Sequence, residues 1–136
     1  MIGLLVVTHG ELAAELVGAA RRIVSQPGPI AGLAIDWDSD VDTSRQRIRD
    51  ALTSLDQGDG VIIATDMFGG TPTNVALTFL EPGKVEVVTG VNLPMVIKFT
   101  NMREQLDLAE AARTLAERGR SSITVAGEIL SGRRKE

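Results

Sequence analysis

Short apolar runs alternate with stretches of helical spacing along the whole chain. The runs at 2–8 and 61–65 are almost wholly apolar, which is typical of parallel strands buried on both faces. Shorter runs at 30–35 and 85–89 predict two further strands, and a last strand is expected over 121–126 before a charged tail at 131–136. Apolar residues recur at helical spacing in the segments between, and predict helices over 11–25, from Asp40 or Asp42 through Leu55, over 71–80, from Leu93, and over 104–118.

Strands that alternate with helices favour an α/β fold. We expect an open, doubly wound, mainly parallel sheet with helices on both faces. The chain contains no internal repeat and no linker long enough to separate two domains. The sequence therefore predicts a single domain over residues 1–136.

Composition narrows the possible functions. The 136 residues are 43% hydrophobic but only 3% aromatic, so the core must be aliphatic. The absence of cysteine excludes disulfides, thiolate metal sites and cysteine nucleophiles, and fits a reducing cytoplasm. A net charge of −4 argues against non-specific nucleic-acid binding. We find neither an apolar stretch long enough to span a membrane nor a secretory signal, which predicts a cytoplasmic protein without membrane insertion.

The only histidine, His9, closes the first apolar run and is followed at once by Gly10 and Glu11. It therefore lies where a strand gives way to a helix. In open α/β sheets, ligands and reactive groups collect outside the carboxyl ends of the strands. Imidazole can accept and release a phosphoryl group or a proton near neutral pH. A lone histidine is nevertheless more often structural, so His9 needs a second observation.

That observation is the segment Asp66-Met67-Phe68-Gly69-Gly70-Thr71-Pro72-Thr73-Asn74, which follows the third predicted strand. If the first and third strands are neighbours, Asp66 and His9 project into one crevice. A carboxylate bonded to one ring nitrogen fixes the tautomer and leaves the other nitrogen free to attack. Backbone and side-chain donors suited to phosphoryl oxygens follow, from Gly69, Gly70, Thr71 and Thr73. The alternative is an ordinary strand-to-helix connector with Thr71 as its cap.

Three motifs carry a family resemblance: Val7-Thr8-His9-Gly10-Glu11-Leu12-Ala13, the segment Asp66–Asn74, and Gly90-Val91-Asn92-Leu93-Pro94-Met95. Together they resemble the mannose-family enzyme IIA of the bacterial sugar phosphotransferase system, over nearly the whole chain. The resemblance implies a phosphotransferase component without a cofactor or metal. It implies that His9 accepts a phosphoryl group from the phosphohistidine of the carrier protein HPr, and that Asp66 orients His9. It also implies a homodimer in which a C-terminal strand crosses to the partner's sheet edge.

Two departures leave the acceptor open. No fused enzyme IIB domain follows the last predicted strand, so we expect a separate IIB protein as the acceptor, if there is one. The stretch from Gly32 to Asp40 is more similar to stand-alone members that act as regulatory phospho-switches. Transport and regulation therefore both remain possible. The sequence also leaves open the sugar and the attacking ring nitrogen, for which we expect Nε2.

The sequence also permits alternatives to a phosphotransferase component. A flavodoxin-like module could bind a phosphorylated small ligand at Gly69–Thr73 without catalysis, although the chain has few aromatics to stack a flavin. A regulatory dimer could act without chemistry. The carboxylates of Asp36–Asp42 resemble a calcium loop, but Val41 occupies the position that requires glycine and Arg47 that of the bidentate acid. We interpret this loop as solvated. Trp37 could face a partner, but we expect it to be a half-buried anchor of the loop.

Overall fold

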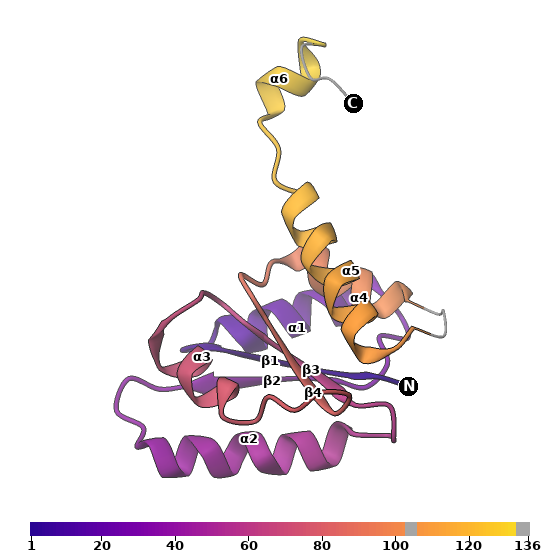
Figure 1. The fold of residues 1–136 in the computed structure, drawn as a ribbon. Helices are drawn as coiled ribbons and strands as arrows, with labels where there is room; N and C mark the ends of the chain where they lie inside the picture. Colours follow the sequence, from indigo (N-terminus) through magenta and orange to yellow (C-terminus); the bar gives the residue numbers. More distant parts are fainter. Residues whose placement is uncertain (103–105, 133–136) are drawn as a thin grey trace.

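A four-stranded, all-parallel sheet forms the centre of the protein (Figure 1). The computed structural model describes residues 1–102 and 106–132. The strands stand in the order β2-β1-β3-β4, so that β1 and β3 lie side by side in the middle of the sheet. They are β1 (Gly3–His9), β2 (Ile30–Ile35), β3 (Val61–Thr65) and β4 (Val85–Thr89), which confirms the four apolar runs as strands.

Helices cover both faces of this sheet (Figure 1). On one face lie α1 (Leu12–Ile23), α4 (Leu93–Asn101) and α5 (Leu108–Ser121). On the other lie α2 (Val41–Leu55) and α3 (Gly70–Leu77). The predicted doubly wound α/β fold is thus confirmed. Of the helix expected over 104–118, residues 104 and 105 lie outside the described residues, residues 106 and 107 precede the helix, and the remainder lies in α5.

Strand β1 shows why the central runs are apolar throughout. Its side chains alternate between the two faces. Leu4 and Val6 pack into the cluster under α1, α4 and α5, whereas Leu5 and Val7 pack into the cluster over α2 and α3. All four are fully buried. A strand covered on both faces favours apolar side chains at both its odd and its even positions.

Side-chain caps define where three of the helices begin. Asp40, and not Asp42, accepts the backbone N–H of Thr43 and caps α2. These hydrogen bonds from Thr43 hold the pKa of Asp40 below its usual value. Asn92 caps α4, and Asp107 caps α5 in a reciprocal box with Glu110.

The strand expected over 121–126 is wrong for the single chain. Ser121 ends α5, residues 122–125 belong to no strand, and Ala126–Leu130 form a short helix, α6. Figure 1 shows that α5 leads this segment away from the sheet, toward α6. Alternating apolar residues become a strand only where a sheet edge supplies hydrogen-bond partners, and in the described residues this segment pairs with no strand of the sheet. Of the tail expected over 131–136, residues 133–136 lie outside the described residues.

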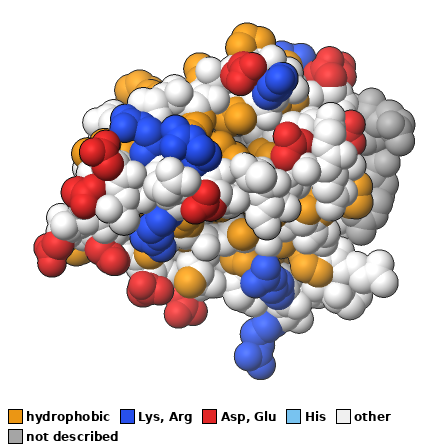
Figure 2. Space-filling view, turned by 90° about the horizontal axis from the view of Figure 1, so that it is seen from below, with side chains coloured by type: hydrophobic (Ala, Val, Ile, Leu, Met, Phe, Trp, Pro, Cys, Tyr) orange, Lys and Arg blue, Asp and Glu red, His pale blue; other side chains and the backbone are white. Residues whose placement is uncertain are grey.

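The outer face of α2 is charged with both signs. Figure 2, which views the molecule from this side, shows Lys and Arg side chains interspersed with Asp and Glu. On α2 these include Asp42, Arg45, Arg49 and Asp50. Such a mixed face is typical of a solvated helix surface. Over residues 1–102 and 106–132, no helix combines the length and the apolar character that crossing a membrane requires.

Two glycines test how tightly the layers are packed. A Cβ on Gly3, which is buried at the start of β1, would lie 2.9 Å from the backbone oxygen of Leu55 at the end of α2. We predict that Gly3→Ala lowers the free energy of unfolding by about 1–3 kcal/mol, because backbone must move to admit the methyl group. Gly18 in α1 has open space around it and is the matched control.

We expect Gly18→Ala to raise the free energy of unfolding by about 0.5–1 kcal/mol, since alanine is the better helix former. Urea denaturation of both variants measures the difference. Equal stability of the two variants would contradict the close packing of α2 against β1.

Candidate active site

His9 and Asp66 meet at the carboxyl edge of the sheet. His9 is the last residue of β1, and Asp66 follows the last residue of β3. The two strands are hydrogen-bonded neighbours, which meets the condition under which the two side chains share one crevice. The chain leaves β1 for α1 on one face of the sheet and leaves β3 for α3 on the other. This divergence opens the crevice that binds ligands in open α/β folds.

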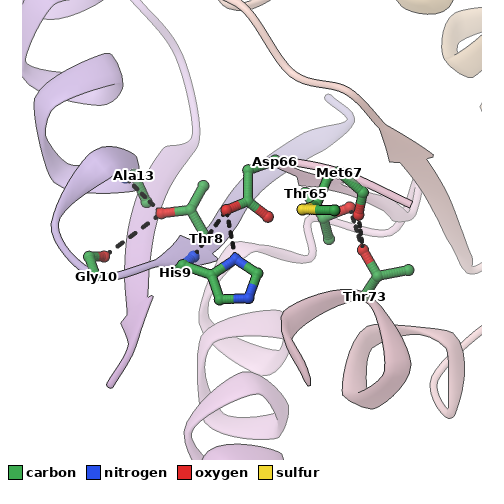
Figure 3. Close-up of polar contacts among 8 residues, drawn as sticks. All are labelled: Thr8, His9, Gly10, Ala13, Thr65, Asp66, Met67 and Thr73. Atoms are coloured by element: carbon green, nitrogen blue, oxygen red, sulfur yellow. Dashed lines mark hydrogen bonds and ion pairs between the residues drawn. The ribbon is translucent and has the colours of Figure 1, made fainter. Parts of the chain in front are cut away.

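One carboxylate oxygen of Asp66 holds His9 at two points (Figure 3). Asp66 Oδ2 lies 2.7 Å from Nδ1 of the ring and accepts the backbone N–H of His9 at 3.0 Å. An ionised carboxylate can only accept hydrogen bonds, so Nδ1 must carry the proton. In the neutral ring, the lone pair then resides on Nε2. The side chains of His9 and Asp66 are 22% and 13% exposed, which leaves the site open to a partner.

The charge of Asp66 is maintained by these contacts. Burial alone raises the pKa of Asp66, but the hydrogen bonds from the His9 ring and backbone N–H outweigh it, and the pKa lies below its usual value. The second oxygen, Oδ1, is buried without a hydrogen-bond partner in the part of the chain that the structure describes. Asp66 therefore remains an acceptor dedicated to His9.

The start of α3 lies beside the other ring nitrogen. Gly69 and Gly70 both have positive φ angles, +91° and +82°, and no side chain caps the helix. A Cβ on Gly70 would lie 3.0 Å from Cε1 and 3.1 Å from Nε2 of His9. Glycine at this position therefore leaves space next to Nε2. Thr71, in the first turn, is exposed.

Thr73 does not reach the surface of the site. It is fully buried, and its hydroxyl donates to the carbonyl oxygen of Met67 and lies 2.7 Å from the hydroxyl of Thr65 (Figure 3). This burial contradicts the predicted phosphate contact of the Thr73 side chain. Its hydroxyl instead ties the loop after β3 to the strand beneath it.

Thr8 is a residue that the sequence reasoning missed. It is fully buried, and its hydroxyl oxygen accepts the backbone N–H of Ala13 at 2.7 Å (Figure 3). No side chain of the residue before α1 performs this role. The hydroxyl at the end of β1 thus fixes the start of α1, and with it the turn after His9. A polar residue inside an otherwise apolar strand was the available signal.

The half-buried environment expected for Trp37 is wrong. Trp37 is 82% exposed, and its ring stacks on the imidazole of His9 with centroids 5.0 Å apart and an interplanar angle of 27°. Its position after β2, which pairs with β1, was the signal that could have placed it.

The described residues contain no cluster of three or more histidine, aspartate or glutamate side chains that could hold a metal ion.

The site therefore combines a nucleophilic nitrogen, a fixed tautomer and an uncapped helix start. A nucleophile oriented by a carboxylate is the arrangement used in covalent catalysis. Free backbone N–H groups at a helix N-terminus favour an anion. Together they suit the transfer of an anionic group to and from Nε2.

Known proteins are similar to this chain in sequence and in fold. The model of the family described as PTS system fructose IIA component, where PTS denotes the phosphotransferase system, matches residues 3–116. The fructose-specific EIIA component of Bacillus subtilis is 26% identical over 131 residues, which cover 96% of this chain and 90% of that protein. The mannose-specific EIIAB component of Escherichia coli is also 26% identical, over 90% of this chain but only 38% of its own length.

A solved structure agrees with these relatives. The mannose/sorbose-specific IIA subunit from Enterococcus faecalis is 25% identical and superposes with a TM-score of 0.81 over 90% of this chain and 92% of its own. The match extends from β1 through most of α5, and so includes both strand ends of the site. The chain belongs to the EIIA-man family of phosphotransferase-system IIA components.

Proposed function

We propose that this phosphoryl carrier of the phosphotransferase system holds its phosphoryl group on Nε2 of His9. The observation that carries the proposal is the 2.7 Å contact between Nδ1 of His9 and Asp66. It leaves Nε2 as the nitrogen with a free lone pair, at an open edge of the sheet. His9 is also the only histidine in the chain.

In the proposed step, Nε2 of His9 attacks the phosphorus of a donor phosphohistidine in line with the breaking bond. A new P–N bond forms, and the old P–N bond breaks with its electron pair returning to the donor ring. The proton on Nδ1 stays between His9 and Asp66, whose negative charge balances the positive charge that develops on the ring. The bond that forms and the bond that breaks are both P–N bonds to an imidazole, so the transfer is nearly balanced in free energy and the step is reversible.

The uncapped start of α3 supports a place for the phosphoryl oxygens. We assign their binding to the backbone N–H groups at Gly70 and Thr71, with the Thr71 hydroxyl as a further donor. Gly69 shapes the turn that presents these groups. The helix dipole adds a favourable field for a charge that is transferred onto Nε2.

The partners follow from the family. We propose phosphorylated HPr as the donor and, as acceptor, either a separate enzyme IIB or a regulatory target, with the protein acting in the cytoplasm. The surface of the site is the same for either acceptor. We further propose that residues 1–136 act as a single enzyme IIA domain.

The first prediction concerns the acceptor atom. The protein incubated with phosphoenolpyruvate, enzyme I and HPr should gain the mass of one phosphoryl group, in an acid-labile form. His9→Ala should gain none, because no other histidine can replace it. Intact-mass spectrometry measures the uptake, and circular dichroism controls for folding. An acid-labile phosphoryl group on the folded His9→Ala variant would refute the assignment.

The second prediction distinguishes the steric effect of an added side chain from backbone strain at Gly69 and Gly70. Gly69 and Gly70 share positive φ angles, so alanine is strained at either position, but only a Cβ on Gly70 contacts the His9 ring. We predict that Gly70→Ala slows phosphorylation by roughly a hundredfold, because the methyl group displaces the ring by a fraction of an ångström. Gly69→Ala, which has no atom within 4 Å of its Cβ, should lose much less.

Quenched-flow transfer from phosphorylated HPr compares the two variants. Equal losses would mean that backbone strain alone matters and that the ring edge beside Gly70 is not where the phosphoryl group enters.

We also propose a homodimer in which residues 122–125 pair with the β4 edge of a second copy. Two features support it. Ile123 and Val125 are exposed apolar residues on a segment that α5 directs away from its own sheet (Figure 1). Strand β4 is the last strand of the sheet, and an open edge requires a cover. A reciprocal exchange closes a two-fold dimer.

The third prediction follows from this exchange. The full chain should sediment as a dimer at micromolar concentration. A chain that ends after Ser121 keeps α5 whole but loses the exchanged segment, and should sediment as a monomer or aggregate. A chain that ends after Gly132 is the matched control and should remain dimeric. A monomeric full chain would contradict the exchange but not the chemistry at His9.

A further inference from the structure

The indole of Trp37 lies against the imidazole of His9. The ring centroids are 5.0 Å apart and the planes are inclined by 27°, so the rings stack. Aromatic pairs at such separations attract each other beyond the area that they bury. Yet Trp37 is 82% exposed, so most of its surface does not pack against this chain. The aromatic contact of Trp37 in the described residues is with the single histidine.

The fold brings this tryptophan to the site by strand register. Ile35, the last residue of β2, pairs with His9 in the parallel ladder, and its carbonyl oxygen accepts the backbone N–H of Gly10. Trp37 follows two residues later, in a short loop. The loop is closed by a turn in which Ser39 N–H donates to Asp36, and it ends at Asp40, the cap of α2. Both ends of the loop are therefore fixed.

The hydrogen bond to Asp66 and the neighbouring Gly70 do not by themselves fix the tilt of the imidazole plane. The hydrogen bond to Asp66 holds Nδ1 but allows the ring to tilt about that contact. Gly70 lies beside Cε1 and Nε2 without a side chain to hold them. The lone pair of Nε2 lies in the plane of the ring, so a tilt turns it away from an incoming phosphorus. The indole of Trp37 stacks on one face of the ring and so opposes this tilt.

We propose that Trp37 is a positioning residue for His9, which fixes the plane of the imidazole so that Nε2 points at the phosphoryl donor. Trp37 acts through the ring and does not contact the phosphoryl group. The proposal rests on the proposed role of His9 as phosphoryl acceptor. It goes beyond that role because it assigns the ring geometry to a residue outside the two strand ends.

A small donor separates positioning from docking. Phosphoramidate phosphorylates imidazole without a protein partner: the Nε2 lone pair forms the new P–N bond, and the bond to the protonated nitrogen breaks with its electron pair, which releases ammonia. Because no protein docks, an exposed aromatic that served only as a docking contact has no effect on this rate. A residue that holds the ring plane does.

The experiment compares three variants with the parent protein. We expect Trp37→Ala to react with phosphoramidate about tenfold more slowly, because the ring loses its orientation. Trp37→Phe keeps a stacking ring and should remain within about threefold of the parent. Phe68→Ala removes another aromatic, 77% exposed, that has no stacking contact with His9 in the described residues, and should match the parent rate.

A spectroscopic measurement tests the stack without any phosphoryl transfer. Because the chain has one histidine and one tryptophan, the carbon-bound ring protons of His9 are resolved directly by NMR. The indole ring current should shift them in the parent, Trp37→Ala should abolish the shift, and Phe68→Ala should preserve it. With phosphorylated HPr as donor, Trp37→Ala should lower kcat more than it raises KM.

The outcomes distinguish this proposal from the proposed function. If Trp37→Ala reacted with phosphoramidate at the rate of the parent protein, the positioning role would be overturned. Identical chemical shifts of the His9 ring protons in Trp37→Ala and in the parent would overturn it too. An effect of Trp37→Ala confined to KM for HPr would make Trp37 a docking residue and also overturn it. Failure of the parent to accept any phosphoryl group, with the ring-current shift present, would refute the function of His9 but not the stack.

Discussion

The hydrogen bond between Asp66 and the ring of His9 is the interaction on which the site depends. It joins the ends of two strands that are 57 residues apart in sequence, and it closes only because β1 and β3 are adjacent in the sheet. One oxygen accepts both the ring and the backbone N–H of His9, so the carboxylate sets the position of the residue and the tautomer of its side chain together. The same contacts hold the pKa of Asp66 low, which keeps the acceptor charged when the ring gains positive charge.

The rest of the fold maintains this pair. The aliphatic clusters on the two faces of β1 leave its backbone no freedom to shift relative to β3. Thr8 and Thr73 anchor the connections that follow the two strands, by hydroxyl groups buried directly beneath the site. The reactive side chains can then be partly exposed while their backbone remains rigid. A carrier needs this combination, because its nucleophile must be accessible to two partners in turn and must present the same geometry to each.

The sequence predicted the four strands and the parallel sheet, because apolar runs are local signals with a fixed consequence in α/β folds. It predicted the pairing of His9 with Asp66 on the condition that the first and third strands are neighbours, which the sheet order meets. The prediction failed where the structure of a segment, or the environment of a side chain, depends on the part of the molecule that packs against it. Residues 122–125 have the pattern of a strand but meet no edge in their own chain. Thr73 has the composition of an anion ligand but points into the core, since its helix presents that side to Thr65. Trp37 was misplaced because its partner, His9, is far away in sequence and adjacent only through the β1–β2 register.

The tautomer of His9 tests the central claim most directly. In a nitrogen-15 correlation spectrum of the unphosphorylated protein, the single histidine gives one set of ring signals. The account predicts that the neutral ring carries its proton on Nδ1 in the parent, with Nε2 unprotonated, and that Asp66→Asn shifts the population toward the Nε2-protonated form. A parent protein whose neutral His9 is protonated on Nε2 would contradict the account, because the nitrogen proposed to receive the phosphoryl group would then have no lone pair to attack.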